Sequence, residues 1–419
     1  ISCKKYLLCT NRIIMKAKTF LLLFVLANAF IFCSQTNKDN YLETVLNNLE
    51  KIESATYQIE QLAWNPYDDD PVYDFCYYVY EYHNPVDTTI GASFVSLKAD
   101  DTTLFSAYDG NVRIVVWDES KTLGIDNFSV NRFNLPFRLV SPPFYNYTKN
   151  IIKYILTTSD SITVDKLEND NYWHVKLTIH EDRQVEFFGK AYKIPDAPMF
   201  GEDPTSIYEI WIDKKTNLPY KFRREMSHNI TESIVSNPEF NKMKIEDFHV
   251  SDYFPSDYKI LSYNDALENR NNRKSNELEG RIAPDFELID TQDDKVSLQD
   301  MKSKAILLQF TGIGCGPCYA SIPFMEKISK EYPEDLLTVA SIETWSGKIQ
   351  TLQNYKKKNQ FTYLFLKSED SITQAYNAMG VPQFFILNEK RVITKVFEGY
   401  AENTTDNEIR KEIDGLLNK

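Results

Sequence analysis

The sequence predicts two domains of different class: an α+β domain with a large antiparallel sheet, then an α/β domain. Short segments of alternating apolar and polar residues recur from residue 55 to 250, separated by turn sequences such as Asp109-Gly110. Beyond residue 282 the pattern changes to a mostly apolar strand, 305–310, and then to apolar residues at helical spacing, 320–332. The 419 residues are long enough for both domains.

Residues 1–36 are predicted to be an export signal. Met15 begins a basic stretch followed by an apolar run, the order found in secretory signals, so we expect Met15 to be the true start. A small-residue cleavage site at Ala27–Ala29 predicts a soluble periplasmic protein, whereas Cys33 just after the apolar run predicts a lipid anchor. A retained signal anchor is the third option, although the apolar run is short for a membrane span. Each outcome places the protein in the periplasm or cell envelope.

Residues 37–258 are expected to form the sheet-rich domain. A helical stripe opens it at 41–52, and an inserted helix is expected at 144–157. The expected strands are 55–63, 75–82, 92–97, 103–108, 111–118, 161–167, 172–180, 207–213, 218–226 and 243–250.

A late strand-turn-strand in this domain, Trp211-Ile212-Asp213 followed by Leu218-Pro219, resembles the LolA/LolB-like half-barrel of periplasmic lipoprotein carriers. That resemblance implies a half-barrel-like sheet with an apolar groove for an acyl chain or peptide. The alternative is that the same apolar residues fill a solid core. Residues 259–281 are predicted to be a linker, because 262–281 almost lacks large apolar side chains.

The motif Cys315-Gly316-Pro317-Cys318 carries the chemistry of the second domain, 282–419. At a helix N-terminus, free N–H groups and the helix dipole favour the reactive thiolate, and a proline is tolerated in the first turn. Half of a zinc site is the alternative, but zinc needs two more ligands. No further Cys follows, and the five His all precede residue 250: His83, His174, His180, His228 and His249. We expect no metal and no cofactor.

With its flanking segments, this motif resembles the TlpA/ResA-like thiol-disulfide oxidoreductases, which have a thioredoxin-like fold. The resemblance covers about residues 280–419 and rests on Ala283–Leu288, Val296–Leu298, the strand at 305–310, the cysteine motif, Leu337–Ile342 and Gly380-Val381-Pro382-Gln383. It implies a cis peptide bond before Pro382 beside the cysteines. Gly316, Pro317 and Val381 would then contact the substrate, with Pro382 shielding the more exposed Cys315.

The same resemblance implies the roles of the side chains. Cys315 is expected to be the attacking thiolate and Cys318 the more buried resolving thiol. Two positions depart from the thioredoxin pattern: Gln309 stands where a buried Asp is usual, and Gly314 stands where a Trp is usual. Glu343, at the end of the next strand, is therefore the candidate proton acceptor for Cys318. The alternative for Glu343 is a solvated loop acid.

The sequence predicts an exported thiol-disulfide oxidoreductase that reduces or exchanges disulfides of periplasmic proteins, with a membrane electron donor as a further partner. An oxidase or isomerase is an open alternative, as is a lipid- or peptide-binding carrier with a redox-regulated second domain. A peroxiredoxin is disfavoured, because no Pro precedes Thr311 within its strand and a second cysteine follows Cys315. The net charge of −13 argues against a nucleic-acid partner.

Overall fold

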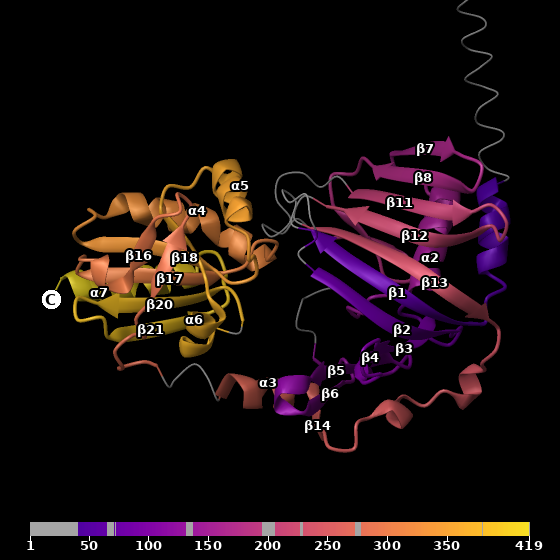
Figure 1. Cartoon of the computed structure of the whole chain (residues 1–419), viewed down its shortest axis with the longest axis horizontal. Coiled ribbons are helices and arrows are strands. Elements are labelled where there is room, and N and C mark those ends of the chain that lie inside the picture. The colour runs from indigo at the N-terminus through magenta and orange to yellow at the C-terminus, as the bar shows by residue number, and fades with distance from the viewer. Residues whose placement is uncertain are drawn as a thin grey trace, which may run out of the picture.

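The computed structural model shows two lobes, each built on its own sheet (Figure 1). It describes residues 41–64, 71, 73–130, 137–194, 206–226, 229–272, 278–378 and 380–418. The predicted export signal, with Met15 and Cys33, lies outside these residues. Within the described part of the chain, no helix has both the length and the apolarity that a membrane crossing requires.

The first lobe contains a twelve-stranded sheet in the order β14-β6-β5-β4-β3-β2-β1-β13-β12-β11-β8-β7. Neighbouring strands are antiparallel except for the parallel pair of β14 and β6. The strands are β1 (Ser54–Trp64), β2 (Tyr73–His83), β3 (Ala92–Lys98), β4 (Leu104–Tyr108), β5 (Arg113–Trp117), β6 (Thr122–Asp126), β7 (Ile162–Glu168), β8 (Tyr172–Ile179), β11 (Ser206–Asp213), β12 (Leu218–Glu225), β13 (Ile230–Phe240) and β14 (Lys259–Ser262).

The predicted large antiparallel sheet is therefore confirmed. The sheet ends at β14 on one side and at β7 on the other, so it is not closed. This strand order gives no support to the half-barrel resemblance. A separate pair, β9 (Val185–Phe187) and β10 (Ala191–Lys193), forms a small antiparallel sheet. A helical turn, η1 (Asp118–Ser120), joins β5 to β6.

Two segments of this lobe differ from the predicted strands. The expected strand at 243–250 is wrong: the chain forms the short helical turns η3 (Ile245–Asp247) and η4 (Val250–Tyr253). Phe248, which lies between them, stacks on Tyr82 with ring centroids 4.7 Å apart, so the segment covers the sheet instead of extending it. The central strand β13 was not predicted, because polar residues and Pro238 interrupt its apolar pattern.

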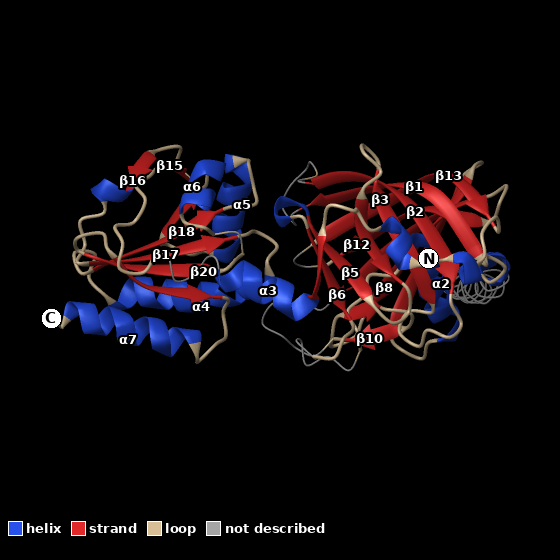
Figure 2. Cartoon of the chain, turned by 90° about the horizontal axis from the view of Figure 1, so that it is seen from below, coloured by secondary structure: helices blue, strands red, loops and turns tan. Residues whose placement is uncertain are grey.

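The region predicted as a linker, 259–281, has regular structure at its start. β14 adds a strand to the sheet, and α3 (Tyr263–Asn272) follows it directly. Figure 2 shows α3 between the two lobes. The sheet of the first lobe therefore extends past residue 258.

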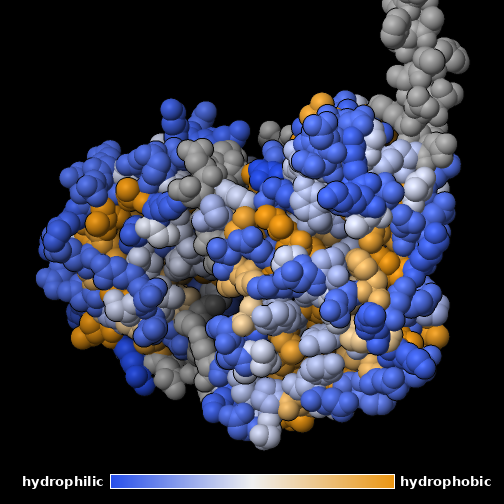
Figure 3. All heavy atoms as spheres, turned by 45° about the vertical axis from the view of Figure 1, so that its right-hand side comes forward, coloured by the Kyte–Doolittle hydropathy of each residue, from blue (hydrophilic) through white to orange (hydrophobic). Residues whose placement is uncertain are grey.

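A helical stretch at 41–49 and the helix α2 (Phe144–Thr157) pack on one face of the large sheet. Residues 144–157 were predicted as a helix, and the bounds agree. Ile151 and Ile152 of α2 share a buried core with Tyr208 and Ile210 of β11. The apolar residues of this face are thus packed against one another. The surface, by contrast, is mostly hydrophilic in the view of Figure 3, with apolar side chains in patches.

A buried carboxylate fixes α2 to the sheet. Glu81 of β2 accepts hydrogen bonds from the backbone N–H groups of Tyr145 (3.1 Å) and Asn146 (2.7 Å) and from the hydroxyl of Tyr57 (2.8 Å). The residue before α2 supplies no side-chain cap, so Glu81 caps the helix from a neighbouring strand. Burial raises the pKa of Glu81, although its hydrogen bonds act in the opposite direction.

We predict that Glu81→Ala lowers the free energy of unfolding of this lobe by about 3 kcal/mol, because three buried donors lose their acceptor. Urea unfolding followed by tryptophan fluorescence would measure the change. Glu60→Ala is the matched control, since Glu60 is an exposed acid on the neighbouring strand β1. Equal effects of the two substitutions would contradict the capping role of Glu81.

The second lobe contains a seven-stranded sheet in the order β16-β15-β19-β18-β17-β20-β21. β18 lies parallel to both β17 and β19, and the remaining pairs are antiparallel. The strands are β15 (Glu287–Asp290), β16 (Lys295–Ser297), β17 (Ala305–Thr311), β18 (Leu337–Glu343), β19 (Leu364–Lys367), β20 (Gln383–Asn388) and β21 (Ile393–Glu398). The helices are η5 (Leu298–Asp300), α4 (Gly316–Glu331), α5 (Ile349–Asn359), α6 (Asp370–Ala375) and α7 (Thr405–Leu417).

Strand β17 lies at the centre of this lobe and is buried along its whole length. Its alternate residues enter two cores: Leu307 packs in a cluster with residues of α4, α5 and α7, and Leu308 packs in a cluster on the other face. A strand covered on both faces is held in one register, and its end is therefore a fixed platform. The cysteine motif follows that end.

Candidate active site

The two cysteines lie at the start of α4, directly after the turn that follows β17. Cys315 is the N-cap residue and Cys318 lies in the first turn. A disulfide joins them, and the Cys315 sulfur also accepts a hydrogen bond from the backbone N–H of Cys318 (3.2 Å). The helix N-terminus thus directs an N–H group at the sulfur that would carry negative charge in the reduced protein.

Both sulfur-bearing residues are buried. Cys315 is 6% exposed and Cys318 is 2% exposed, so Cys315 is the more accessible of the two, as expected, although little of it reaches the surface. The loop before β20 covers it: the Val381 carbonyl oxygen lies 3.7 Å from the Cys315 sulfur. A disulfide sulfur carries no hydrogen, so this is a contact and not a hydrogen bond. The Val381–Pro382 bond is cis, as the resemblance implies.

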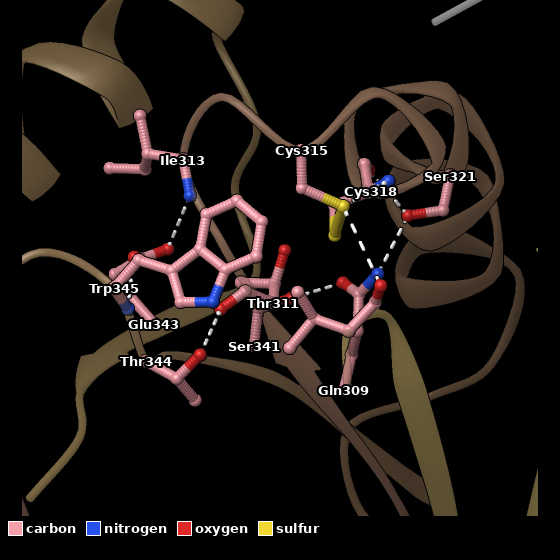
Figure 4. The surroundings of a disulfide bond; sticks show 11 residues. Gln309, Thr311, Ile313, Cys315, Cys318, Ser321, Ser341, Glu343, Thr344 and Trp345 are labelled. Atoms are coloured by element: carbon pink, nitrogen blue, oxygen red, sulfur yellow. Dashed lines mark hydrogen bonds between the residues drawn. A yellow bond between two sulfur atoms is a disulfide. The ribbon is translucent and has the colours of Figure 1, made fainter. Parts of the chain in front are cut away.

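A chain of neutral polar groups runs beneath the disulfide (Figure 4). The Ser341 hydroxyl donates to the Gln309 carbonyl oxygen (2.7 Å), and the Gln309 amide donates to the Ser321 hydroxyl (2.6 Å). Ser321 in turn donates to the backbone carbonyl of Cys318 (2.6 Å). Gln309 is thus satisfied without a titrating proton. Neither serine was predicted from the sequence; the spacing of Ser321 three residues after Cys318 is the signal that could have revealed one.

Glu343 is fully buried, so the alternative of a solvated loop acid is wrong. One carboxylate oxygen accepts a hydrogen bond from the Ile313 N–H (2.9 Å), and the other accepts from Trp345 (2.8 Å) and Ser346 (2.9 Å). None of these bonds reaches Cys318, and Figure 4 shows the carboxylate pointing toward Ile313. Burial raises the pKa of Glu343 to about 7, although the three N–H donors act to lower it.

Glu343 therefore makes the stability of this lobe depend on pH. Its folded pKa of about 7 exceeds its usual 4.5, so its contribution is largest below pH 4.5 and is lost as the pH rises to 7. We predict that wild type loses about 3 kcal/mol across this window relative to Glu343→Gln. Urea unfolding of wild type and Glu343→Gln at several pH values measures the difference between their free energies of unfolding. The titration of other groups is common to both proteins and cancels in this difference. Parallel stability curves would contradict the raised pKa.

Known proteins are similar in sequence to the second lobe. Residues 278–413 match the Redoxin family. The thioredoxin-like protein YneN of Bacillus subtilis (strain 168) is 36% identical over 137 residues, which are 32% of this chain and 79% of that protein. The thiol-disulfide oxidoreductase ResA of the same strain is 28% identical over 122 residues, which are 29% of this chain and 68% of that protein.

Solved structures are similar over the same share of the chain. A thiol:disulfide interchange protein of the thioredoxin family from Chlorobium tepidum TLS is 20% identical, with a TM-score of 0.30. The match covers 32% of this chain and 95% of that one.

Proposed function

The chain belongs, through its C-terminal domain, to the thioredoxin-like thiol-disulfide oxidoreductases, and from this premise we propose that it reduces disulfides of exported proteins through Cys315 and Cys318. The observation that carries the proposal is the disulfide at the N-terminus of α4, in contact with the Val381 carbonyl. Support for export comes from the sequence of residues 1–36, which has the order of a secretory signal. Cys33 in that segment is the residue that a lipid anchor would use.

The reaction begins with the reduced protein. The Cys315 thiolate attacks one sulfur of a substrate disulfide, a Cys315–substrate bond forms, and the second substrate sulfur leaves as a thiolate. Cys318 then loses its proton and attacks the Cys315 sulfur, which breaks the mixed disulfide and releases the substrate. The substrate gains two electrons and the protein loses two, which leaves the Cys315–Cys318 disulfide. A dithiol or membrane-bound electron donor then reduces that disulfide again.

We predict that Cys315→Ala abolishes disulfide reduction, whereas Cys318→Ala accumulates mixed disulfides, because no internal thiol remains to release the substrate. Non-reducing gels of the full chain after reaction with a disulfide-containing protein measure the trapped species. Cys76→Ala is the control, since Cys76 is a free cysteine of β2 in the other lobe. Capture by Cys315→Ala but not by Cys318→Ala would reverse the two roles.

For the proton of Cys318, we propose Glu343 as the acceptor. A buried carboxyl with a pKa of about 7 exchanges protons with a thiol more readily than an ordinary carboxyl does. Gln309, the buried polar residue of β17, cannot take this proton. The carboxylate would have to exchange one of its backbone bonds, or act through water, to reach the sulfur.

We therefore predict that Glu343→Gln changes the pH dependence of mixed-disulfide release. In wild type, release should accelerate as the pH rises through about 7, because Glu343 becomes a carboxylate that accepts the proton. Glu343→Gln should lose this acceleration near pH 7, and its release rate should keep only the pH dependence that ionisation of the thiol sets. Single-turnover rates from pH 5 to 9 test this, with Glu389→Gln as the control, an exposed acid beyond the opposite end of β20. Superimposable profiles would contradict the proposal.

The direction of electron flow separates a reductase from an oxidase or isomerase. It depends on the reduction potential of the Cys315–Cys318 pair, which equilibration with glutathione measures. A potential well below that of glutathione supports the reductase. A carrier whose dithiol only regulates binding would show no turnover. The packing of α2 against the sheet gives no support to a groove for lipid or peptide in the first lobe.

A further inference from the structure

We propose that Trp345 determines substrate specificity: its exposed indole face binds an apolar or aromatic side chain that neighbours the cysteine of a polypeptide substrate. The inference rests on the proposed function and adds which polypeptides the site prefers. None of the hydrogen bonds described above joins Trp345 to either sulfur. We therefore assign Trp345 to substrate recognition and not to the chemical step.

Trp345 is exposed although it is the largest apolar side chain near the disulfide. It is 46% exposed, two residues past the end of β18, and the chain has no other tryptophan beyond Trp211. Figure 4 shows its indole between Glu343 and the cysteines. Tryptophan is among the residues that contribute most to binding when an interface covers them, because a large rigid surface leaves water. An exposed indole here is suited to a partner that reaches the disulfide.

Two contacts position Trp345, one made by its ring and one made by its backbone. Its ring lies against Gly312: a Cβ atom at that glycine would be 2.4 Å from the ring, so a larger residue there would force the ring to move. The backbone N–H of Trp345 donates to one Glu343 oxygen (2.8 Å), and the other oxygen accepts from the backbone N–H of Ile313 (2.9 Å). The turn that carries Trp345 and the turn that leads into Cys315 are thus fixed to one buried group. A preordered surface loses little entropy on binding.

Trp345 also lies at the end of the sheet from which the cysteine motif follows. β18 and β20 are the two neighbours of β17, so Trp345 and Val381 come from strands on either side of the one that leads to Cys315. Gln383 pairs with Phe310, which places the start of β20 at the same end of the sheet.

These positions define the occupant. A polypeptide whose cysteine reaches the Cys315 sulfur along the Val381 carbonyl brings its neighbouring residues past the indole. Successive side chains of an extended chain are about 3.3 Å apart along the strand, so a residue next to the cysteine is within reach of the ring. The face of an indole is electron-rich and apolar, which favours aromatic and aliphatic side chains and disfavours acidic ones.

The test uses the reduced full chain and two disulfide-linked peptide dimers that differ only in Phe or Ser beside the cysteine. Wild type should reduce the Phe peptide about tenfold faster, the discrimination expected when one apolar side chain is bound. Trp345→Ala should bring the ratio of the two rates close to one, and Trp345→Phe should retain most of it. Ile282→Ala is the control, because Ile282 is 73% exposed and pairs with Val392 at the opposite end of the sheet.

Two results would overturn the inference. The first is a wild-type ratio near one. The second is a ratio that Trp345→Ala leaves unchanged, even if both rates fall, because an equal loss shows a structural role only. If wild type reduces neither peptide, the proposed function fails together with the inference. Loss of preference in Ile282→Ala would also count against Trp345 as its source.

Discussion

A single buried carboxylate joins the parts of the second lobe on which its chemistry depends. Glu343 ends β18 in register with Thr311, the last residue of β17, so the turns after both strands begin side by side. Its oxygens accept N–H groups from both turns, at Ile313 and at Trp345 and Ser346. Without an acceptor these three donors would be left without partners in a dry interior, which is costly. The turn that places Cys315 is therefore fixed by a residue of another strand.

Apart from the cysteines, Glu343 is the group beneath the motif that ionises near neutral pH, because Gln309 and its two serine partners are neutral. Gln309 and the two serines around it form a chain of donors and acceptors that has no charge at any physiological pH. Glu343, with a pKa of about 7, changes charge near neutrality. When it is protonated, it becomes a weaker acceptor for the backbone. The protonation state of Glu343 therefore affects the hydrogen bonds that join the two turns.

The sequence predicted the parts of the protein that follow from local pattern and failed where tertiary contacts decide. The bounds of α2 and the strands around the cysteine motif follow from apolar periodicity, and they agree with the structure. β13 was missed because its neighbours β1 and β12 on both sides stabilise a strand that its own residues predict poorly. The burial of Cys315 comes from a loop distant in sequence, and the exposed Trp345 gave no motif to recognise.

Two buried acids show why burial alone does not identify function. Glu81 and Glu343 are both enclosed, both accept backbone N–H groups, and the pKa of each is raised by burial. Glu81 caps the first turn of α2 inside the core, and this structural role explains why a carboxylate is buried there. Glu343 serves turns that reach a reactive disulfide and an exposed aromatic ring, so its proton can affect chemistry outside the core. The two acids differ in the backbone segments that they bind: Glu81 binds the start of a buried helix, and Glu343 binds the turns beside the cysteine motif. Only the structure shows this difference.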